Sequence, residues 1–257
     1  MTLRTIHLRS TDSTNSEARR LFLSGEAMPV LVRADTQTAG RGRNGRQWQS
    51  PTGGAWFSVA WAMRSNPATY VPTPIVTAAA VHEALAPLVQ RDRNVEIKWP
   101  NDILIDGLKV CGVLCETAFS GQRGAVIVGI GVNVNVDVSS LGPDLRCPAT
   151  SLHEHTTTEP AIDRVIAGIA ACLTRRLRSL DERGLSDDVI RYVEAHLAGR
   201  GRSITWSSVV AEPSAMARKT GVLRGLDARG AIVLDTDTEQ LTLDHGELLA
   251  ESPAEMT

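Results

Sequence analysis

The sequence lacks the features that mark membrane-bound, secreted and nucleic-acid-coating proteins. Its longest apolar stretches, 125–134 and 75–81, are far shorter than the roughly 20 residues of a membrane helix, and its N-terminus has no apolar signal core. Four irregularly spaced cysteines in 257 residues are too few for a disulfide framework. The formal net charge of −2 excludes a strongly basic surface for nucleic acids. We therefore expect a soluble cytoplasmic protein with reduced thiols and no membrane attachment.

Lysine is also scarce. Of the 27 basic residues, only Lys98, Lys109 and Lys219 are lysines, and the other 24 are arginines. Arginine can replace lysine at most solvated positions, but not where a compact ammonium group is needed. Two of the three lysines lie eleven residues apart, which draws attention to the segment 98–109.

The remaining composition, 42% hydrophobic and 22% charged, is that of an ordinary globular protein. After residue 198 the pattern changes to short, glycine-broken strands over 203–251, a barrel of SH3-like size, so we place two domains at 1–198 and 199–257. In the first domain, periodicity predicts helices over 14–24, 73–87, 160–181 and 187–198, and strands over 4–9, 30–34, 55–63, 95–98, 103–105, 108–116 and 124–135.

Two local patterns make specific predictions. Thr14 and Glu17 have the spacing of a capping box, so Thr14 is expected to cap the first helix. Lys109 alternates with Cys111 and Val113, which predicts that the three share one strand face. A lysine among buried residues requires an anion, unless it lies at an edge and reaches solvent.

Residues 36–54 form a segment rich in Gly, Arg and Gln that is too long for a simple turn. Its centre, 40–46, satisfies the G-x-G-x-x-G pattern, but 48–54 cannot form the helix that would hold a dinucleotide pyrophosphate. Its three arginines can instead clamp a phosphate from a glycine-hinged loop. The alternative is a solvated basic loop or a nucleic-acid contact.

Two further segments combine structural signals with functional side chains. Lys98–Asp102 follows a strand, and its Asn–Asp pair suits a magnesium ion or a substrate amine, or forms a simple Asx turn. Gly129 and Gly131 lie inside an apolar strand, so something packs on its backbone or the strand carries a bulge. Cysteines and histidines do not gather at ligand spacing, and we expect no structural metal site.

Four ordered segments together resemble the biotin–protein ligases, and the resemblance covers essentially the whole chain. It implies an α+β fold with a mixed or antiparallel sheet and flanking helices, related to class II aminoacyl-tRNA synthetases, followed by a small C-terminal SH3-like β-barrel. Domain 1–198 would be the catalytic domain that binds biotin and ATP. The segments are Asp12–Asn15, Gln37–Arg43, Lys98–Asp102 with Leu108–Gly112, and Gly129–Asn133.

The resemblance also implies a two-step reaction. Biotin and ATP, with Mg²⁺, form biotinoyl-5′-AMP and pyrophosphate. A lysine of a biotin carboxyl carrier protein, or of the carrier domain of acetyl-CoA or acyl-CoA carboxylase, then takes the biotinoyl group. Such a protein must hold an apolar bicycle with a polar ureido end, neutralise phosphates and exclude water from the mixed anhydride.

By the same resemblance, three residues are expected to be catalytic. Lys109 would lie between the biotin carboxylate and the α-phosphate, Arg43 would guard the adenylate, and Asp102 would meet nucleotide, magnesium or the incoming amine. The expected biotin-binding residues are Ser13, Thr14, Asn15, Gln37, Arg41, Gly42, Arg43, Lys109, Gly112 and Gly129. The expected nucleotide-binding residues are Arg43, Lys98, Trp99, Asn101, Asp102, Gly131 and Asn133.

Three other functions compete with this one. A lipoate–protein ligase is related in fold, but the Gly-Arg-Gly-Arg loop and Lys-Trp-Pro-Asn-Asp favour biotin. A nucleic-acid binder would need aromatic residues near the arginine loop to stack on bases. A biotin sensor would have no catalytic use for Lys109, Arg43 and Asp102. Because the first family motif begins at residue 12, we also expect no N-terminal DNA-binding domain and no specific DNA binding.

Overall fold

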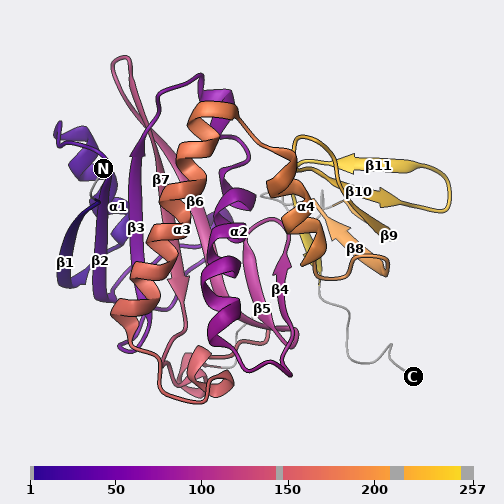
Figure 1. The fold of residues 1–257 in the computed structure, drawn as a ribbon, viewed down its shortest axis with the longest axis horizontal. Helices are drawn as coiled ribbons and strands as arrows, with labels where there is room; N and C mark the ends of the chain where they lie inside the picture. The colour runs from indigo at the N-terminus through magenta and orange to yellow at the C-terminus, as the bar shows by residue number, and fades with distance from the viewer. Residues whose placement is uncertain (1–2, 143–146, 209–216, 250–257) are drawn as a thin grey trace.

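The computed structural model describes residues 3–142, 147–208 and 217–249, and its main element is a seven-stranded sheet (Figure 1). The strand order is β1-β2-β3-β7-β6-β5-β4. β1 and β2 pair in parallel and the other neighbours are antiparallel, so the sheet is mixed. Its strands are β1 (Arg4–Thr11), β2 (Val30–Gln37), β3 (Ala55–Ala62), β4 (Val95–Lys98), β5 (Asp102–Ile105), β6 (Leu108–Ser120) and β7 (Arg123–Val132).

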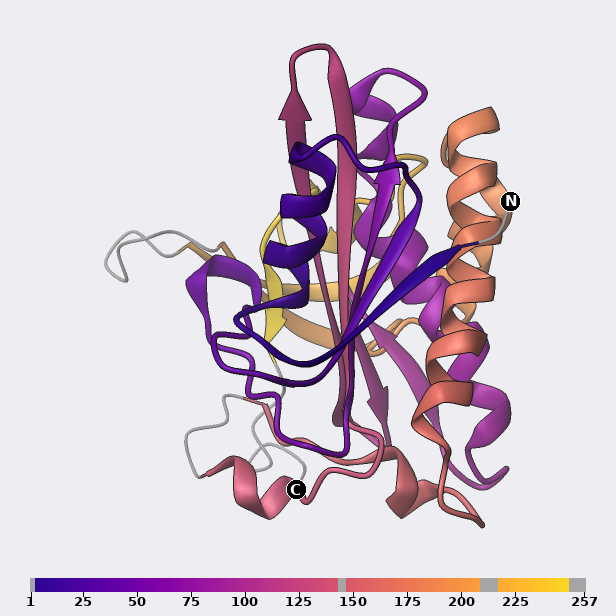
Figure 2. The same cartoon turned by 90° about the vertical axis from the view of Figure 1, so that its left-hand side faces the viewer.

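Helices cover both faces of this sheet, α1 on one and α2 with α3 on the other (Figure 2). β3 shows why both faces need cover, since Phe57 and Val59 join the core under α2 and α3, whereas Ala60 packs under α1. The α-helices are α1 (Thr14–Leu23), α2 (Thr73–Leu85), α3 (Ile162–Arg183) and α4 (Asp187–Ala195), and short 3₁₀ turns lie at Arg43–Gly45, Pro67–Tyr70, Ala86–Leu88, Val138–Leu141 and Leu152–His155.

A second sheet of five antiparallel strands follows α4, in the order β11-β10-β9-β8-β12. Ile75 of α2 and Trp99, from the turn between β4 and β5, are buried in the core of this sheet, so the two sheets share a packed interface. Residues 209–216 and 250–251 of the predicted strand-rich segment lie outside the described residues. The strands are β8 (Ser203–Ser207), β9 (Arg218–Leu226), β10 (Ile232–Asp235), β11 (Gln240–Leu243) and β12 (Glu247–Leu249).

The predicted fold class is confirmed. A mixed sheet with flanking helices is followed by a small antiparallel sheet, which is consistent with an SH3-like domain. The predicted helices and strands of the first 198 residues are present with shifted ends; β6, for example, continues to Ser120. None of the helices in the described part of the chain combines the length and hydropathy that a bilayer span needs.

The predicted capping box at Thr14 is wrong. Ser13 is the N-cap of α1, and its side chain forms no capping hydrogen bond. The backbone N–H and the hydroxyl of Thr14 instead both donate to Gln37 Oε1, at 2.8 and 3.1 Å. A tertiary partner from the end of β2 therefore replaces the local cap.

The predicted strand face of Lys109 is also wrong. Along the β5–β6 ladder, Ile103 pairs with Cys111 but Leu104 pairs with Lys109, so Val110 is an extra residue in a β-bulge. Val110 and Cys111 both enter the core under α2. The bulge thereby turns Lys109 to the opposite face, where the α1 helix lies.

Candidate active site

A cavity of about 610 Å³ opens on the α1 face of the large sheet and is closed on one side by β12. Every residue that the sequence predicted to bind biotin or nucleotide lines it. The structure thus brings the four motif segments to one place, while the role of each residue stays a prediction. The other lining residues are Arg46, Gln47, Trp48, Gln49, Pro100, Val113, Leu114, Ile130, Leu141, Cys147, Ala149 and Glu247–Leu249.

One end of the cavity is a buried cluster of hydroxyl and amide groups at the start of α1. Thr14 and Asn15 are each only 4% exposed. Gln37 accepts two hydrogen bonds from Thr14, and its own Nε2 donates to Ser50. Ser58 Oγ lies 2.7 Å from Thr14 Oγ1 and 2.6 Å from Asn15 Oδ1. The mutual bonds fix these side chains, so their remaining donors and acceptors are preorganised for a polar ligand group.

The floor of the cavity is glycine backbone covered by Trp48. Gly112 and Gly131 are register partners on β6 and β7, and Cβ atoms built there would lie 2.8 and 2.6 Å from the Trp48 ring. A Cβ on Gly129 would lie 2.2 Å from Asn15 Oδ1. The prediction that something packs closely on this strand is therefore confirmed. Trp48 was not predicted, because a lone tryptophan in a loop carries no signal of where its ring packs.

The opposite end is charged. Lys109 Nζ lies 2.8 Å from Asp102 Oδ1 and 5.2 Å from the Trp48 ring centroid. Arg43 donates to Asn101 Oδ1 at 3.0 Å and to the Gly246 carbonyl at 3.1 Å. Burial lowers the pKa of Arg43, against the opposing effect of Asp102. A guanidinium that has lost water stays charged and gains from meeting an anion.

The arginine loop is held at both ends by carboxylates that the sequence analysis missed. Arg41 forms an ion pair with Glu116 of β6, at 3.1 Å. Arg46 forms a bidentate pair with Glu247 of β12, at 2.7 and 2.9 Å. Neither pairing has a sequence signal, since 75 and 201 residues separate the partners.

Three predicted nucleotide-binding residues have contacts that bear on their role. Trp99 Nε1 donates to the Gly230 carbonyl, and its ring packs in the core of the second sheet, so this side chain joins the two sheets. Asn133 Nδ2 donates to the Thr150 carbonyl. The Lys98 ammonium group lines the cavity without a hydrogen bond or ion pair to any described residue. Lys98 is therefore a cation that a phosphate could engage directly.

Within the described residues, the other reactive groups do not form a second centre. Burial raises the pKa of the Cys111 and Cys115 thiols, which makes them poor nucleophiles. Among residues 3–142, 147–208 and 217–249, no three His, Cys, Asp or Glu side chains gather as metal ligands.

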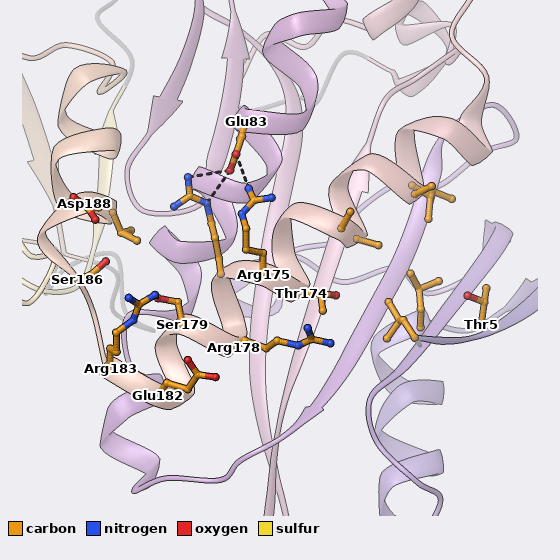
Figure 3. A pocket seen from close by; sticks show the side chains of 18 of the residues that line it. Thr5, Glu83, Thr174, Arg175, Arg178, Ser179, Glu182, Arg183, Ser186 and Asp188 are labelled. Atoms are coloured by element: carbon orange, nitrogen blue, oxygen red, sulfur yellow. Dashed lines mark hydrogen bonds and ion pairs between the residues drawn. The ribbon is translucent and has the colours of Figure 1, made fainter. Parts of the chain in front are cut away.

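A larger hollow of about 1080 Å³ lies along α3 on the opposite face of the sheet (Figure 3). None of the predicted site residues lines it. Glu83 pairs with Arg175 (Figure 3) and with Arg176, so its carboxylate is already engaged by two neighbours. The chemistry of the molecule is concentrated in the cavity on the α1 face.

Comparison with known proteins identifies the family of this chain. Residues 7–133 match the model of the Biotin/lipoate A/B protein ligase family. The chain is 32% identical over 232 residues to the biotin–[acetyl-CoA-carboxylase] ligase of Paracoccus denitrificans, covering 88% of this chain and 92% of that protein. It is 30% identical over 254 residues to the Mycobacterium tuberculosis protein of the same name, covering 93% and 86%.

The fold comparison extends over the same length. The Aquifex aeolicus biotin protein ligase, solved in complex with biotin and ATP, has a TM-score of 0.78 and 27% identity and covers 95% of this chain and 97% of that one. Sequence similarity over nearly the full length of these relatives, together with the shared fold, shows that the chain belongs to the biotin protein ligase family.

Proposed function

We propose that this protein is a biotin–[biotin carboxyl carrier protein] ligase. It joins biotin to ATP as biotinoyl-5′-AMP and transfers the biotinoyl group to a lysine on the carrier of a biotin-dependent carboxylase, such as acetyl-CoA carboxylase. One observation carries the proposal. A single cavity combines a buried hydroxyl-and-amide end, an apolar tryptophan-covered floor and a cationic end, and biotin adenylation needs these three environments in that sequence.

In the first step, a carboxylate oxygen of biotin attacks the α-phosphorus of ATP, and the bond to pyrophosphate breaks. Negative charge builds up between the two reacting groups. Lys109 provides a fixed ammonium there, because Asp102 holds it at 2.8 Å and the bulge at Val110 points it into the cavity. A preorganised cation of this kind stabilises the transition state more than the ground state.

In the second step, the uncharged amine of the carrier lysine attacks the acyl carbon of the adenylate. The bond to AMP breaks with its electron pair going to the phosphate oxygen, an amide forms, and the nitrogen releases its proton to solvent. We assign Asp102 to the approach of this amine, since its side chain lies at the cavity wall and is 16% exposed. Arg43 and its loop keep water from the anhydride until the amine arrives.

The donor set also fits Mg²⁺ arriving with ATP. Mg²⁺ prefers oxygen ligands and takes one or two protein carboxylates together with phosphate oxygens and water. Asp102 would offer one carboxylate, of which Oδ1 is paired with Lys109, which matches a metal held mainly by the nucleotide. When bound, the ion neutralises phosphate charge.

The remaining cellular assignments follow from this chemistry. All four cysteines are free thiols, which fits an enzyme that works with ATP in the reducing cytoplasm. The carrier domain of the carboxylase is the proposed protein partner.

The test is transfer of biotin to a purified carboxyl carrier domain, with ATP and Mg²⁺, read by intact mass. We expect a gain of one biotinoyl group that disappears when ATP is omitted. No gain, with biotin still raising the melting temperature, would indicate a sensor. No gain with stabilisation by lipoate instead of biotin would indicate a lipoate ligase. Either result refutes the proposal.

A further inference from the structure

Glu116 lies on β6, behind the polar end of the cavity. It follows Gly112 and Leu114 on the α1 face of the strand, but unlike them it does not line the cavity. Its side chain is 32% exposed and contacts two residues that do line it, Asn15 and Arg41. Any effect of Glu116 on a ligand must therefore act through these two side chains.

The first contact fixes the orientation of the Asn15 amide. Asn15 Nδ2 donates to Glu116 Oε2 at 2.7 Å, while Asn15 Oδ1 accepts from Ser58 at 2.6 Å. An ionised carboxylate can only accept, so it selects the nitrogen edge of the amide. The Leu114 carbonyl accepts from the same nitrogen over a longer distance, 3.4 Å, so the short, charged contact to Glu116 is the stronger of the two. The oxygen edge is then turned towards Gly129 at the cavity floor, where one lone pair stays available for a ligand N–H.

The second contact fixes the start of the arginine loop. The same carboxylate accepts from Arg41 Nη2 at 3.1 and 3.3 Å, and Arg41 Nη1 donates to Ser16 Oγ at 2.7 Å. Arg41 is thereby tied to both β6 and α1. One carboxylate thus joins the helix that supplies Asn15 to the loop that covers the cavity.

We propose that Glu116 is a positioning residue for biotin, an inference that rests on the proposed function. A cyclic urea presents N–H donors beside a carbonyl acceptor, so it distinguishes the two edges of an amide. With Glu116 in place, Asn15 offers its oxygen to a urea N–H. Without the negative charge of Glu116, the Asn15 amide can turn its N–H groups to the ligand. These N–H donors would then face the N–H donors of the urea, and neither group would be hydrogen-bonded.

The experiment compares Glu116→Gln with the control Glu26→Gln. The control removes an ion pair with Arg4 of similar exposure, 45% and 49%, that lies outside the cavity. Biotin Kd is measured by calorimetry, and KM for biotin and for ATP by carrier biotinylation. We expect Glu116→Gln to raise biotin Kd and KM about tenfold, as loss of one charge-assisted hydrogen bond does. KM for ATP and the melting temperature should match the control.

A double-mutant cycle with Asn15→Ala separates positioning from general stability. If Glu116 acts through Asn15, adding Glu116→Gln to Asn15→Ala should raise biotin KM less than twofold further. Unchanged biotin affinity in Glu116→Gln overturns the inference, and so does a parallel loss of biotin affinity, ATP affinity and melting temperature. If Glu116→Gln does not fold, Arg41→Ala at its exposed position must raise biotin KM, or the inference fails. A wild-type chain that cannot biotinylate the carrier overturns the proposed function instead.

Discussion

The ion pair between Arg46 and Glu247 gives a quantitative prediction about the arginine loop. It connects the loop to β12, in the second sheet, through two hydrogen bonds of 2.7 and 2.9 Å. Hydrogen bonds to charged groups contribute about 1.5–3 kcal/mol, and exposed ion pairs about 0.2–1 kcal/mol. With side-chain exposures of 37% and 19%, this pair falls between those ranges, and we expect about 1–2 kcal/mol.

Glu247→Gln removes the charge while nearly keeping the shape. A loss of about 1–2 kcal/mol raises the fraction of detached loop roughly 5- to 30-fold. Trypsin cleaves after arginine, and the loop carries Arg41, Arg43 and Arg46. Cleavage in the loop should accelerate by the same factor if the loop opens and closes faster than it is cut. In a chain of this length, the melting temperature should fall by about 2–8 °C if both sheets unfold together.

The matched control is Glu239→Gln, an exposed glutamate of the same sheet region. It should leave both the loop cleavage rate and the melting temperature unchanged. If Glu247→Gln is cleaved no faster than this control, the Arg46–Glu247 pair does not hold the loop, and the energetic reasoning is refuted.

Four further outcomes are expected. Lys109→Ala should slow ATP–pyrophosphate exchange about 10²- to 10³-fold with little change in biotin binding; undiminished exchange would exclude its electrostatic role. Arg43→Ala should shorten the lifetime of the bound adenylate, and Arg43→Lys should not fully restore it because the planar fork is lost; an unchanged lifetime contradicts this. Gly131→Ala should weaken biotin binding at least tenfold in calorimetry, because its Cβ would lie 2.6 Å from the Trp48 ring and displace it. Unaltered affinity would show that the ring moves freely. Burial lowers the pKa of His82 from 6.5 to about 4, so between these pH values the unfolded chain binds more protons than the folded chain. The free energy of unfolding should therefore fall by about 3 kcal/mol as the pH falls from 6.5 to 4. His82→Asn should flatten this dependence in denaturant titrations, and an equally steep profile would assign it to other groups.

Local chemistry explains why much of the site was predictable. Each motif segment carries its information in consecutive residues, as Lys98–Asp102 does, and the helices and strands follow from the periodicity of apolar residues. Gly129 and Gly131 predicted a close approach because glycine inside a strand is otherwise unfavourable. The structure shows what makes that approach, Asn15 and Trp48.

The failures of the sequence analysis have a common physical cause. The face of Lys109 depends on a bulge that exists only in the ladder with β5. The role of Thr14 depends on Gln37, which outcompetes a local cap. In both cases a contact with another element, strand β5 for Lys109 and the end of β2 for Thr14, decided between local alternatives of similar energy.

The sequence by itself determined the chemical groups of this protein, the order of its helices and strands, and its membership of the biotin protein ligase family. Only the tertiary structure decided how those groups are held. Glu116 orients Asn15 and Arg41, and Glu247 fastens Arg46 from a separate sheet. Such contacts join residues up to 201 positions apart, and no local propensity encodes them, because their energy exists only once the packed sheets have brought the partners together.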